Sequence, residues 1–251
     1  MPQDPLLQPF TLKHLTFRNR ILSTAHEPAY TEDGLPKDRY RLYHVEKARG
    51  GLAMTMIGGS SVVARDSPQA FGNITLYKDE CVPWLRRLAD DVHENGAAVM
   101  IQMTHLGSRT RWDRADWLPT VAPSSIPEPV HRAYPKAMED WDVERIIKAY
   151  ADCAERVKEA GLDGIELECA SHLVAQSWSP KTNIRSDGYG GPVALMSFNP
   201  SLVGAAHHLR PDLPVGLVSC GFRVRDWPRL SAARRRHLRA LADFDAIGAG
   251  F

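Results

Sequence analysis

Polar and aromatic side chains follow an apolar stretch of the chain, DGIELEC (163–169), and their types indicate proton transfer and cation binding. His172 can take or give a proton near neutral pH, and the carboxylate of Glu168 can complement a cationic group. Trp178 could hold a cation against its π face, and it could equally belong to the core. The alternatives for the other two are that Glu168 pairs with a neighbouring arginine and that His172 only packs.

Gln102 is a further candidate, because its amide both donates and accepts hydrogen bonds at the end of the stretch AAVMIQMTH (97–105). The alternative is an ordinary surface amide. A long proline-bearing segment, 106–140, follows this stretch. Loops of this length are usually functional or disordered, and active sites of parallel α/β folds form after the carboxyl ends of strands. The segment therefore begins where a site is expected.

The elements that must position these residues are short apolar runs alternating with helical patterns. Continuous apolar runs are typical of parallel strands covered on both faces, and six such runs predict strands over 20–25, 52–62, 97–105, 163–169, 214–220 and 243–250. Apolar spacing and boundary residues predict helices over 38–49, 83–95 and 142–160. The expected buried stripe of the last helix comprises Val143, Ile146, Ile147, Tyr150, Ala154 and Val157. This order predicts an α/β protein with a parallel sheet, either a barrel or a doubly wound sheet.

Composition limits the class of protein. The 251 residues are 43% hydrophobic, which suffices for one large α/β domain or two small ones. The net charge of +1 gives no indication of a nucleic-acid or acidic-membrane partner. The N-terminus lacks a signal-peptide pattern and no apolar run approaches the ~20 residues of a membrane span, so a soluble, cytoplasmic protein is expected. The cysteines form no CxxC pair, which favours buried free thiols and no metal site.

Three stretches occur in a consistent order: PLLQPFTLKHLTFRNRILSTA (5–25), MIQMTHLGSR (100–109) and ASHLVAQSWSPKTNIRSDGYGG (170–191). Together they resemble the old yellow enzyme family of FMN-dependent oxidoreductases. The SHL..Q.WSP form of 171–180 is most similar to the branch that contains trimethylamine and histamine dehydrogenases and N-methylproline demethylases. The resemblance covers about residues 5–191. It implies a TIM (β/α)8 barrel with FMN at the C-terminal face of the strands.

The resemblance also implies roles for residues near the ends of the first strands. The glutamine that matches Gln102 contacts the isoalloxazine ring in the family. Thr24, Ala25 and Gly59 match positions where backbone or small side chains lie close to the flavin. The alternative is that these three are ordinary strand-end residues.

Other positions depart from the family pattern. Glu27 stands where trimethylamine-type enzymes attach their flavin through a cysteine, so a cysteinyl flavin is excluded there. Its carboxylate is expected to lie in the substrate site and to add negative charge near the ring. Glu168 replaces a His or Tyr of the wider family. His105 and Arg109 belong to a motif that has an extra Ser108, and a role in fixing the loop is favoured for both.

The sequence diverges from the family after residue 192. The arginine that usually lies beside the flavin's N1 and ribityl region is missing after Leu217, and local reading-frame slips are one explanation for the divergence. The chain ends after the sixth predicted strand, which predicts one unit, 1–251, that is an incomplete FMN-binding TIM barrel truncated after about six strands. The iron–sulfur cluster of the amine-dehydrogenase branch is expected only in a full-length form.

The resemblance implies an oxidoreductase of amine dehydrogenase or N-demethylase type, in which hydride passes between a substrate or NAD(P)H and FMN. His172 would move protons, Glu168 would meet a cationic group and Gln102 would hold the ring. The alternatives are an ene-reductase acting on activated C=C bonds and a non-catalytic remnant that binds no flavin. The expected partner is a small molecule such as a cationic amine, with neither nucleic acid nor membrane, and the oligomeric state is open.

Overall fold

The computed structural model describes residues 4–12, 14–111, 118–127, 130, 134–168 and 172–176, together with the backbone of three later strands. The chain begins with a short 3-10 helix, Pro5–Leu7, which is followed by an antiparallel hairpin. The hairpin consists of β1 (Phe10–Leu12) and β2 (Leu15–Phe17). It precedes the first strand of the main sheet.

The main sheet has seven parallel strands in the order β8-β5-β4-β3-β11-β10-β9. Their bounds are β3 (Ile21–His26), β4 (Met54–Val62), β5 (Ala98–Thr104), β8 (Gly164–Leu167), β9 (Leu195–Ser197), β10 (Val215–Cys220) and β11 (Ala246–Gly250). The last strand, β11, returns to pair with the first, β3. This cyclic order is that of a barrel, because a doubly wound sheet reverses its strand order at a switch point.

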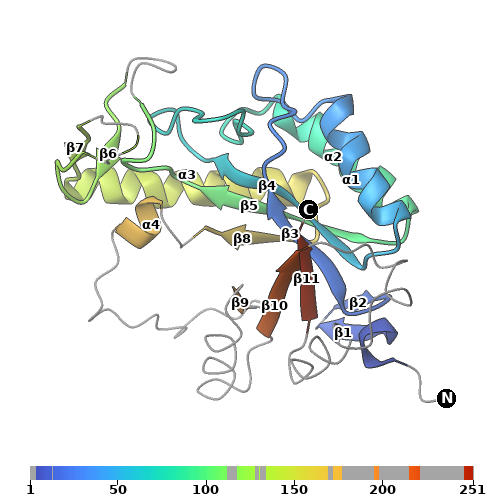
Figure 1. Ribbon diagram of the computed structural model, residues 1–251. Helices are drawn as coiled ribbons and strands as arrows, with labels where there is room; N and C mark the ends of the chain where they lie inside the picture. The colour runs from blue at the N-terminus through green and yellow to red at the C-terminus, as the bar shows by residue number, and fades with distance from the viewer. Residues whose placement is uncertain are drawn as a thin grey trace.

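Three long helices cover one side of the first strands. They are α1 (Asp38–Arg49), α2 (Cys81–Glu94) and α3 (Asp140–Glu159), and they pack on β4, β5 and β8 respectively. Figure 1 shows these helices together on one side of β4 and β5, with β10 and β11 on the other. The core between strands and helices is apolar and includes Ile57, Leu85 and Ile101, each 0% exposed. Burial of this layer is the main stabilising contribution that the described residues show.

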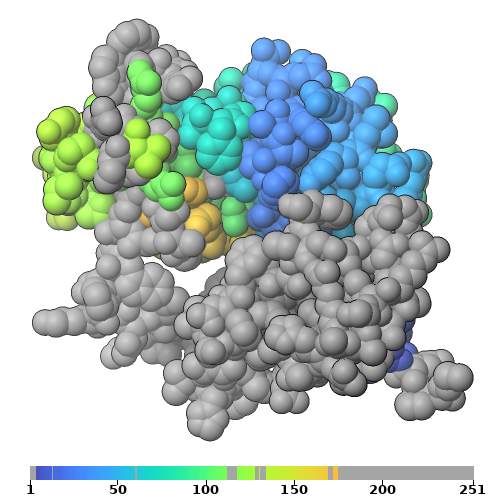
Figure 2. Space-filling model, in the orientation of Figure 1, coloured from blue at the N-terminus to red at the C-terminus, as the bar shows by residue number. Residues whose placement is uncertain are grey.

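Shorter elements follow β5 and β8. The segment after β5 contains β6 (Val121–Ala122) and β7 (Lys136–Ala137), which pair with each other. After β8, one helical turn, α4 (Leu173–Gln176), is held by a hydrogen bond from the amide of Leu173 to the carbonyl of His105 at 2.9 Å. In the space-filling view, the orange atoms of α4 lie against green atoms of the segment after β5 (Figure 2).

All six predicted strands and all three predicted helices are confirmed, with ends that shift by at most three residues. The three-residue β9 was not predicted. The predicted stripe of α3 is wrong at Val143 and Ile147, whose exposed fractions are 42% and 64%. The buried stripe follows Ile146, Cys153 and Val157, and Ile147 lies about 100° further round the helix from Ile146.

Two of the four cysteines lie within the described side chains. Cys81 and Cys153 are free and buried, which confirms the prediction for these two. Burial raises the pKa of Cys81 to about 12 and that of Cys153 to about 11. Both thiols are therefore protonated and unreactive at neutral pH.

Candidate active site

Side chains alternate between two faces along β5. The residues that pack beneath the helices are Val99, Ile101 and Met103, each at most 1% exposed. Successive side chains of a strand point to opposite faces, so the residues on the other, inner face are Met100, Gln102 and Thr104. This inner face is the interior of the barrel, and its polar residues lie toward the carboxyl end of the strand.

Gln102 pairs with a carboxylate on the neighbouring strand. Gln102 and Glu166 stand directly opposite each other in the register of β5 and β8, and Nε2 of Gln102 donates to Oε1 of Glu166 at 2.7 Å. Burial raises the pKa of Glu166, the hydrogen bond from Gln102 lowers it, and nearby Glu168 raises it, with a net rise. One step toward the amino end, a Cβ on Gly164 would lie 3.0 Å from Cε of Met100, so the interior below the pair is closely packed.

A second polar group lies one step closer to the carboxyl ends of the same strands. The ring nitrogen Nδ1 of His172 lies 2.8 Å from Oγ1 of Thr104 and 3.3 Å from Oε2 of Glu168. The backbone amide of Glu168 donates to the carbonyl of Met103 at 3.0 Å, which fixes the end of β8 beside β5. Two tiers of polar side chains thus line the inner face, with Gln102 and Glu166 in the lower tier.

His172 is 8% exposed, and its surroundings disfavour the charged ring. Burial lowers the pKa of His172, the carboxylate of Glu168 raises it, and Arg109 and His105 lower it, with a net fall. The imidazole is therefore mainly neutral at neutral pH and able to accept a proton. The three predicted site residues Gln102, Glu168 and His172 are brought together at one end of the barrel.

The end of β3 contributes smaller groups. Ser23 is 0% exposed and accepts a hydrogen bond from Nζ of Lys47 on α1 at 3.0 Å, so it faces the helices. Thr24 follows it and points to the inner face, where it is partly exposed. Ala25 is also partly exposed and lies in an irregularity of the pairing with β4, between Ser23 and His26.

The carboxyl group of Glu27 turns back into its own loop. Its Oε1 accepts a hydrogen bond from the amide of Ala29 at 2.8 Å. Burial raises the pKa of Glu27 to about 8, although the hydrogen bond from Ala29 acts in the opposite direction. The second carboxyl oxygen, Oε2, is buried and has no hydrogen-bond partner among the described residues. The raised pKa favours the protonated carboxyl at neutral pH, in contrast to the negative charge expected from the sequence. The place of Glu27 in the substrate site stays a prediction. A sequence gives no measure of the burial that keeps the group neutral.

Gly59 packs closely against the loop that contains Glu27. A Cβ at Gly59 would lie 2.9 Å from the backbone nitrogen of Glu27, closer than carbon atoms approach such a nitrogen. The close approach at Gly59 is therefore to protein backbone. The contact between Gly59 and a flavin stays a prediction.

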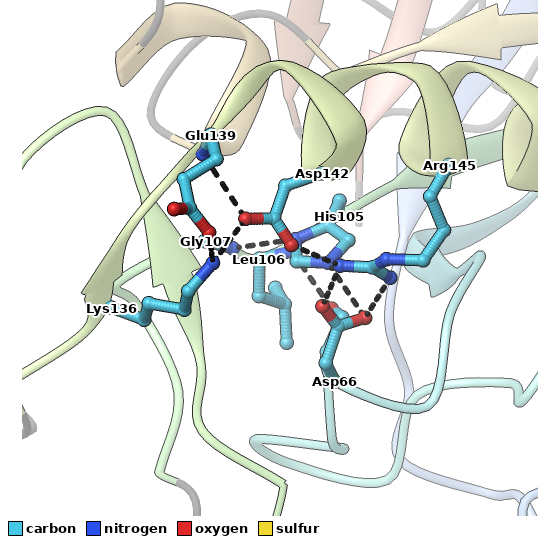
Figure 3. A network of polar contacts seen from close by, with 9 residues as sticks. Asp66, His105, Leu106, Gly107, Lys136, Glu139, Asp142 and Arg145 are labelled. Carbon is cyan, nitrogen blue, oxygen red and sulfur yellow. Dashed lines mark hydrogen bonds and ion pairs between the residues drawn. The ribbon is translucent and has the colours of Figure 1, made fainter.

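A separate network of charges fixes the loop after β5 (Figure 3). His105 Nδ1 accepts a hydrogen bond from the amide of Gly107 at 3.2 Å, so Nε2 carries the hydrogen that it donates to Oδ1 of Asp66 at 3.2 Å. Arg145 on α3 clamps Asp66 with two bonds, Nη1 to Oδ1 at 3.2 Å and Nη2 to Oδ2 at 2.7 Å. The loop-fixing role expected for His105 is supported by these bonds.

The same network continues to the start of α3. Arg145 Nη2 also donates to Oδ1 of Asp142 at 3.1 Å, and Nζ of Lys136 donates to Oδ2 of Asp142 at 2.5 Å. Glu139 and Asp142 form a capping box at the first turn of the helix. Burial alone raises the pKa of Asp66, but the hydrogen bonds from His105 and Arg145 outweigh it and hold that pKa well below its usual range. This network holds structure together and leaves no carboxylate for a substrate.

Sequence reasoning missed Glu166 and Asp66. The spacing of Glu166 and Glu168, two residues apart in a strand, was an available signal that both face the same side. Asp66 had no local signal, because its partners lie 39 and 79 residues away. Trp178 lies outside the described residues. Among the residues that the structure describes, no three His, Cys, Asp or Glu side chains gather as a metal site. No helix in that part has the length and apolar character needed to cross a bilayer.

Comparison with solved structures supports the barrel. Morphinone reductase in complex with tetrahydroNAD superimposes with a TM-score of 0.73 at 18% identity, over 99% of this chain and 86% of that chain. At this level of identity the match shows the fold alone. The fold is that of a TIM barrel, as predicted.

Sequence comparison is more specific. A probable N-methylproline demethylase from Rhizobium meliloti (strain 1021) is 63% identical over 191 residues, 76% of this chain and 28% of the relative. A multifunctional alkene reductase/demethylase from Caballeronia cordobensis is 50% identical over 191 residues, again 76% of this chain and 28% of the relative. An N,N-dimethylglycine/sarcosine dehydrogenase from Chromohalobacter salexigens is 43% identical over 226 residues, 88% of this chain and 33% of the relative.

The chain thus spans about a third or less of the length of these relatives. Residues 5–194, most of the chain, match the family model described as NADH:flavin oxidoreductase / NADH oxidase. The motifs, the barrel order and the convergence of Gln102, Glu168 and His172 agree with that match. The chain belongs to the NADH:flavin oxidoreductase / NADH oxidase family.

Proposed function

We propose that residues 1–251 form one FMN-binding unit of an oxidoreductase that removes a hydride from the N-methyl carbon of a small amine. The observation that carries the proposal is the meeting of an amide, two carboxyl groups and a neutral imidazole on the inner face of the barrel. Two relatives whose names include demethylase support the amine as substrate. NAD(P)H is a further proposed donor, and an iron–sulfur cluster is proposed only for a longer form of the protein.

The residues of the inner face fit a flavin. The pyrimidine edge of FMN carries alternating C=O and N–H groups, and Gln102 has an amide oxygen and a second N–H that no described residue engages. We assign Gln102 to this edge and Thr24, Ala25 and Gly59 to positions alongside the ring system. When bound, FMN supplies the hydride acceptor. Glu27 stays a proposed substrate-site residue, because only its Oε1 bonds its own loop, whereas its Oε2 has no hydrogen-bond partner among the described residues.

The upper tier suits an amine substrate. Loss of hydride from an N-methyl carbon leaves a cationic iminium, and the nitrogen must first lose any proton because its lone pair forms the new C=N bond. Neutral His172 is suited to accept that proton, and the carboxylate of Glu168, 3.3 Å from its ring, stabilises positive charge on either partner. Water then adds to the iminium carbon, which yields the demethylated amine, formaldehyde and one proton. Trp178 stays a proposed cation-binding residue beside them.

The proposal is tested by anaerobic titration of the FMN-loaded chain with N-methylproline in the absence of NADPH. Loss of the visible flavin absorbance is expected with N-methylproline and absent with proline, which has no methyl group to oxidise. Formaldehyde should appear in an amount equal to the flavin reduced. A colourless protein that gains no flavin absorbance with excess FMN would instead identify a non-catalytic unit.

Reduction of activated C=C bonds is a second candidate function, favoured by the relative named as an alkene reductase/demethylase. It predicts that NADPH bleaches the bound flavin and that an enone such as cyclohexenone restores the absorbance. An enzyme that does only this would not respond to N-methylproline. Cytoplasmic location is proposed for either activity and is tested by cell fractionation.

A further inference from the structure

Gln102 uses only part of its hydrogen-bonding capacity within the protein. An amide side chain has two N–H donors and an oxygen that accepts. Among the described residues, the side chain of Gln102 makes one hydrogen bond, from Nε2 to Oε1 of Glu166 at 2.7 Å. The oxygen and the second N–H remain for a ligand on the inner face of the barrel.

Glu166 determines which way this amide turns. Nε2 of Gln102 donates to Oε1 of Glu166 at 2.7 Å, so the amide oxygen faces away from Glu166. The reverse orientation would point the amide oxygen at a carboxyl group that, when ionised, offers only acceptors. The two residues are directly paired across β5 and β8, and this register keeps them side by side.

We propose that Glu166 is a positioning residue, which holds the amide of Gln102 with its oxygen and second N–H matched to the pyrimidine edge of FMN. This inference rests on the proposed FMN-binding function. An amide fixed in advance presents one acceptor and one donor at a constant spacing, which suits the neighbouring N–H and C=O groups of the ring. An amide free to rotate would have to be ordered when the cofactor binds, and that ordering weakens binding.

The competing explanation is that Glu166 and Gln102 only join two strands. Both explanations predict that replacing Glu166 destabilises the barrel somewhat. They differ in whether the effect on FMN passes through Gln102. A double-mutant cycle between the two residues separates them, because residues that act as a unit show non-additive effects.

The test measures the Kd for FMN by quenching of flavin fluorescence, using the 251-residue chain. Glu166→Met keeps a similar shape but accepts no such bond, and its Kd is expected to rise about tenfold, the equivalent of one hydrogen bond. Glu166→Gln keeps an oxygen that can accept the same N–H, so its Kd should stay within about threefold of the parent. In a Gln102→Ala background, Glu166→Met should change the Kd less than about twofold.

Two controls accompany the cycle. Leu167→Gln changes the next residue of β8, whose side chain is half exposed and faces away from Glu166, and it should leave the Kd unchanged. The flavin midpoint potential and visible spectrum are recorded for each variant, because a purely structural pair would not shift them in Glu166→Met and restore them in Glu166→Gln. Thermal unfolding confirms that each variant is folded.

An equal loss of affinity in Glu166→Met with and without Gln102 would overturn the inference, as would a Glu166→Gln variant as weak as Glu166→Met. Either result leaves FMN binding by the parent chain intact. Failure of the parent chain itself to bind FMN would overturn the proposed function along with the inference. The two failures are therefore distinguished by the parent protein alone.

Discussion

Two buried polar groups lie at the carboxyl ends of neighbouring strands, and they differ in how fully their partners are satisfied. The network around Asp66 includes a carboxylate held by His105 and a two-bond clamp from Arg145. The inner-face group has a single hydrogen bond between Gln102 and Glu166 and a histidine shared between Thr104 and Glu168. The first is closed on itself, whereas in the second the amide oxygen and the second N–H of Gln102 have no partner among the described residues.

The pKa shifts follow the same division. The pKa of Asp66 is lowered because the hydrogen bonds from His105 and Arg145 outweigh burial, whereas that of Glu166 is raised because burial outweighs its one amide donor. A buried carboxyl without a cation is unfavourable, and a protein retains such a group where a ligand completes it. This contrast teaches that the balance of partners, more than burial itself, separates a structural charge from a binding site.

The largest expected effect lies in the closed network. Asp66→Ala leaves Arg145 and the buried ring of His105 without their carboxylate, and we expect the free energy of unfolding to fall by about 3 kcal/mol. Urea denaturation followed by circular dichroism measures this loss. Asp152→Asn, which breaks an exposed pair with Lys148, is the matched control and should cost less than about 0.5 kcal/mol. Equal losses in the two variants would erase the contrast between a closed network and an exposed pair.

In the inner-face group, activity should suffer more than stability. His172→Ala removes the proposed proton acceptor, so the rate of amine-dependent flavin reduction should fall about 100-fold. The free energy of unfolding should fall by only about 1 kcal/mol, because the variant loses the hydrogen bond between His172 and Thr104. Stopped-flow absorbance and urea denaturation give the two numbers. A large loss of stability with an unchanged rate would assign His172 to packing.

Glu27 tests a carboxyl whose burial has no cation to offset it. Its folded pKa of about 8 lies above the ordinary 4.5, so the folded protein binds the extra proton between these values and stability falls as pH rises through them. Glu27→Gln removes this dependence. At pH 9 the variant should be more stable than the parent by on the order of 5 kcal/mol, and below pH 4.5 the two should agree. Unfolding is followed across this pH range, and the difference curve cancels neighbouring groups such as Lys47 and His44. If the difference in free energy of unfolding did not change with pH, Glu27 would be ionised in the folded protein.

The smallest effect is expected at Gly59. Gly59→Ala places a Cβ against the backbone of Glu27, and adjustment of that loop should cost about 1 kcal/mol. If the glycine serves only this loop, FMN affinity should remain unchanged while the unfolding midpoint falls. A large loss of flavin affinity with normal stability would indicate that the cofactor also lies against Gly59.

The strands and helices were predictable because covered parallel strands are continuous apolar runs and the helices carry clear boundaries. The meeting of Gln102, Glu168 and His172 was also predictable, since parallel strands bring their carboxyl ends to one side. The charge state of Glu27 was not, because it depends on how buried the carboxyl becomes among Tyr40, Gly59 and its own loop. Asp66 was invisible for a similar reason, as three segments distant in sequence must fold before its partners meet.

The backbone carbonyl of His105 connects the two regions. The oxygen of His105, whose ring belongs to the closed network, holds the first residue of α4, and His172 immediately precedes that residue. His172, the proposed proton acceptor, is therefore held in place through His105, which belongs to the charged network at the start of α3. We therefore expect substitutions at Lys136 or Glu139, on the solvent side of that network, to change the rate of the proposed reaction through the position of His172.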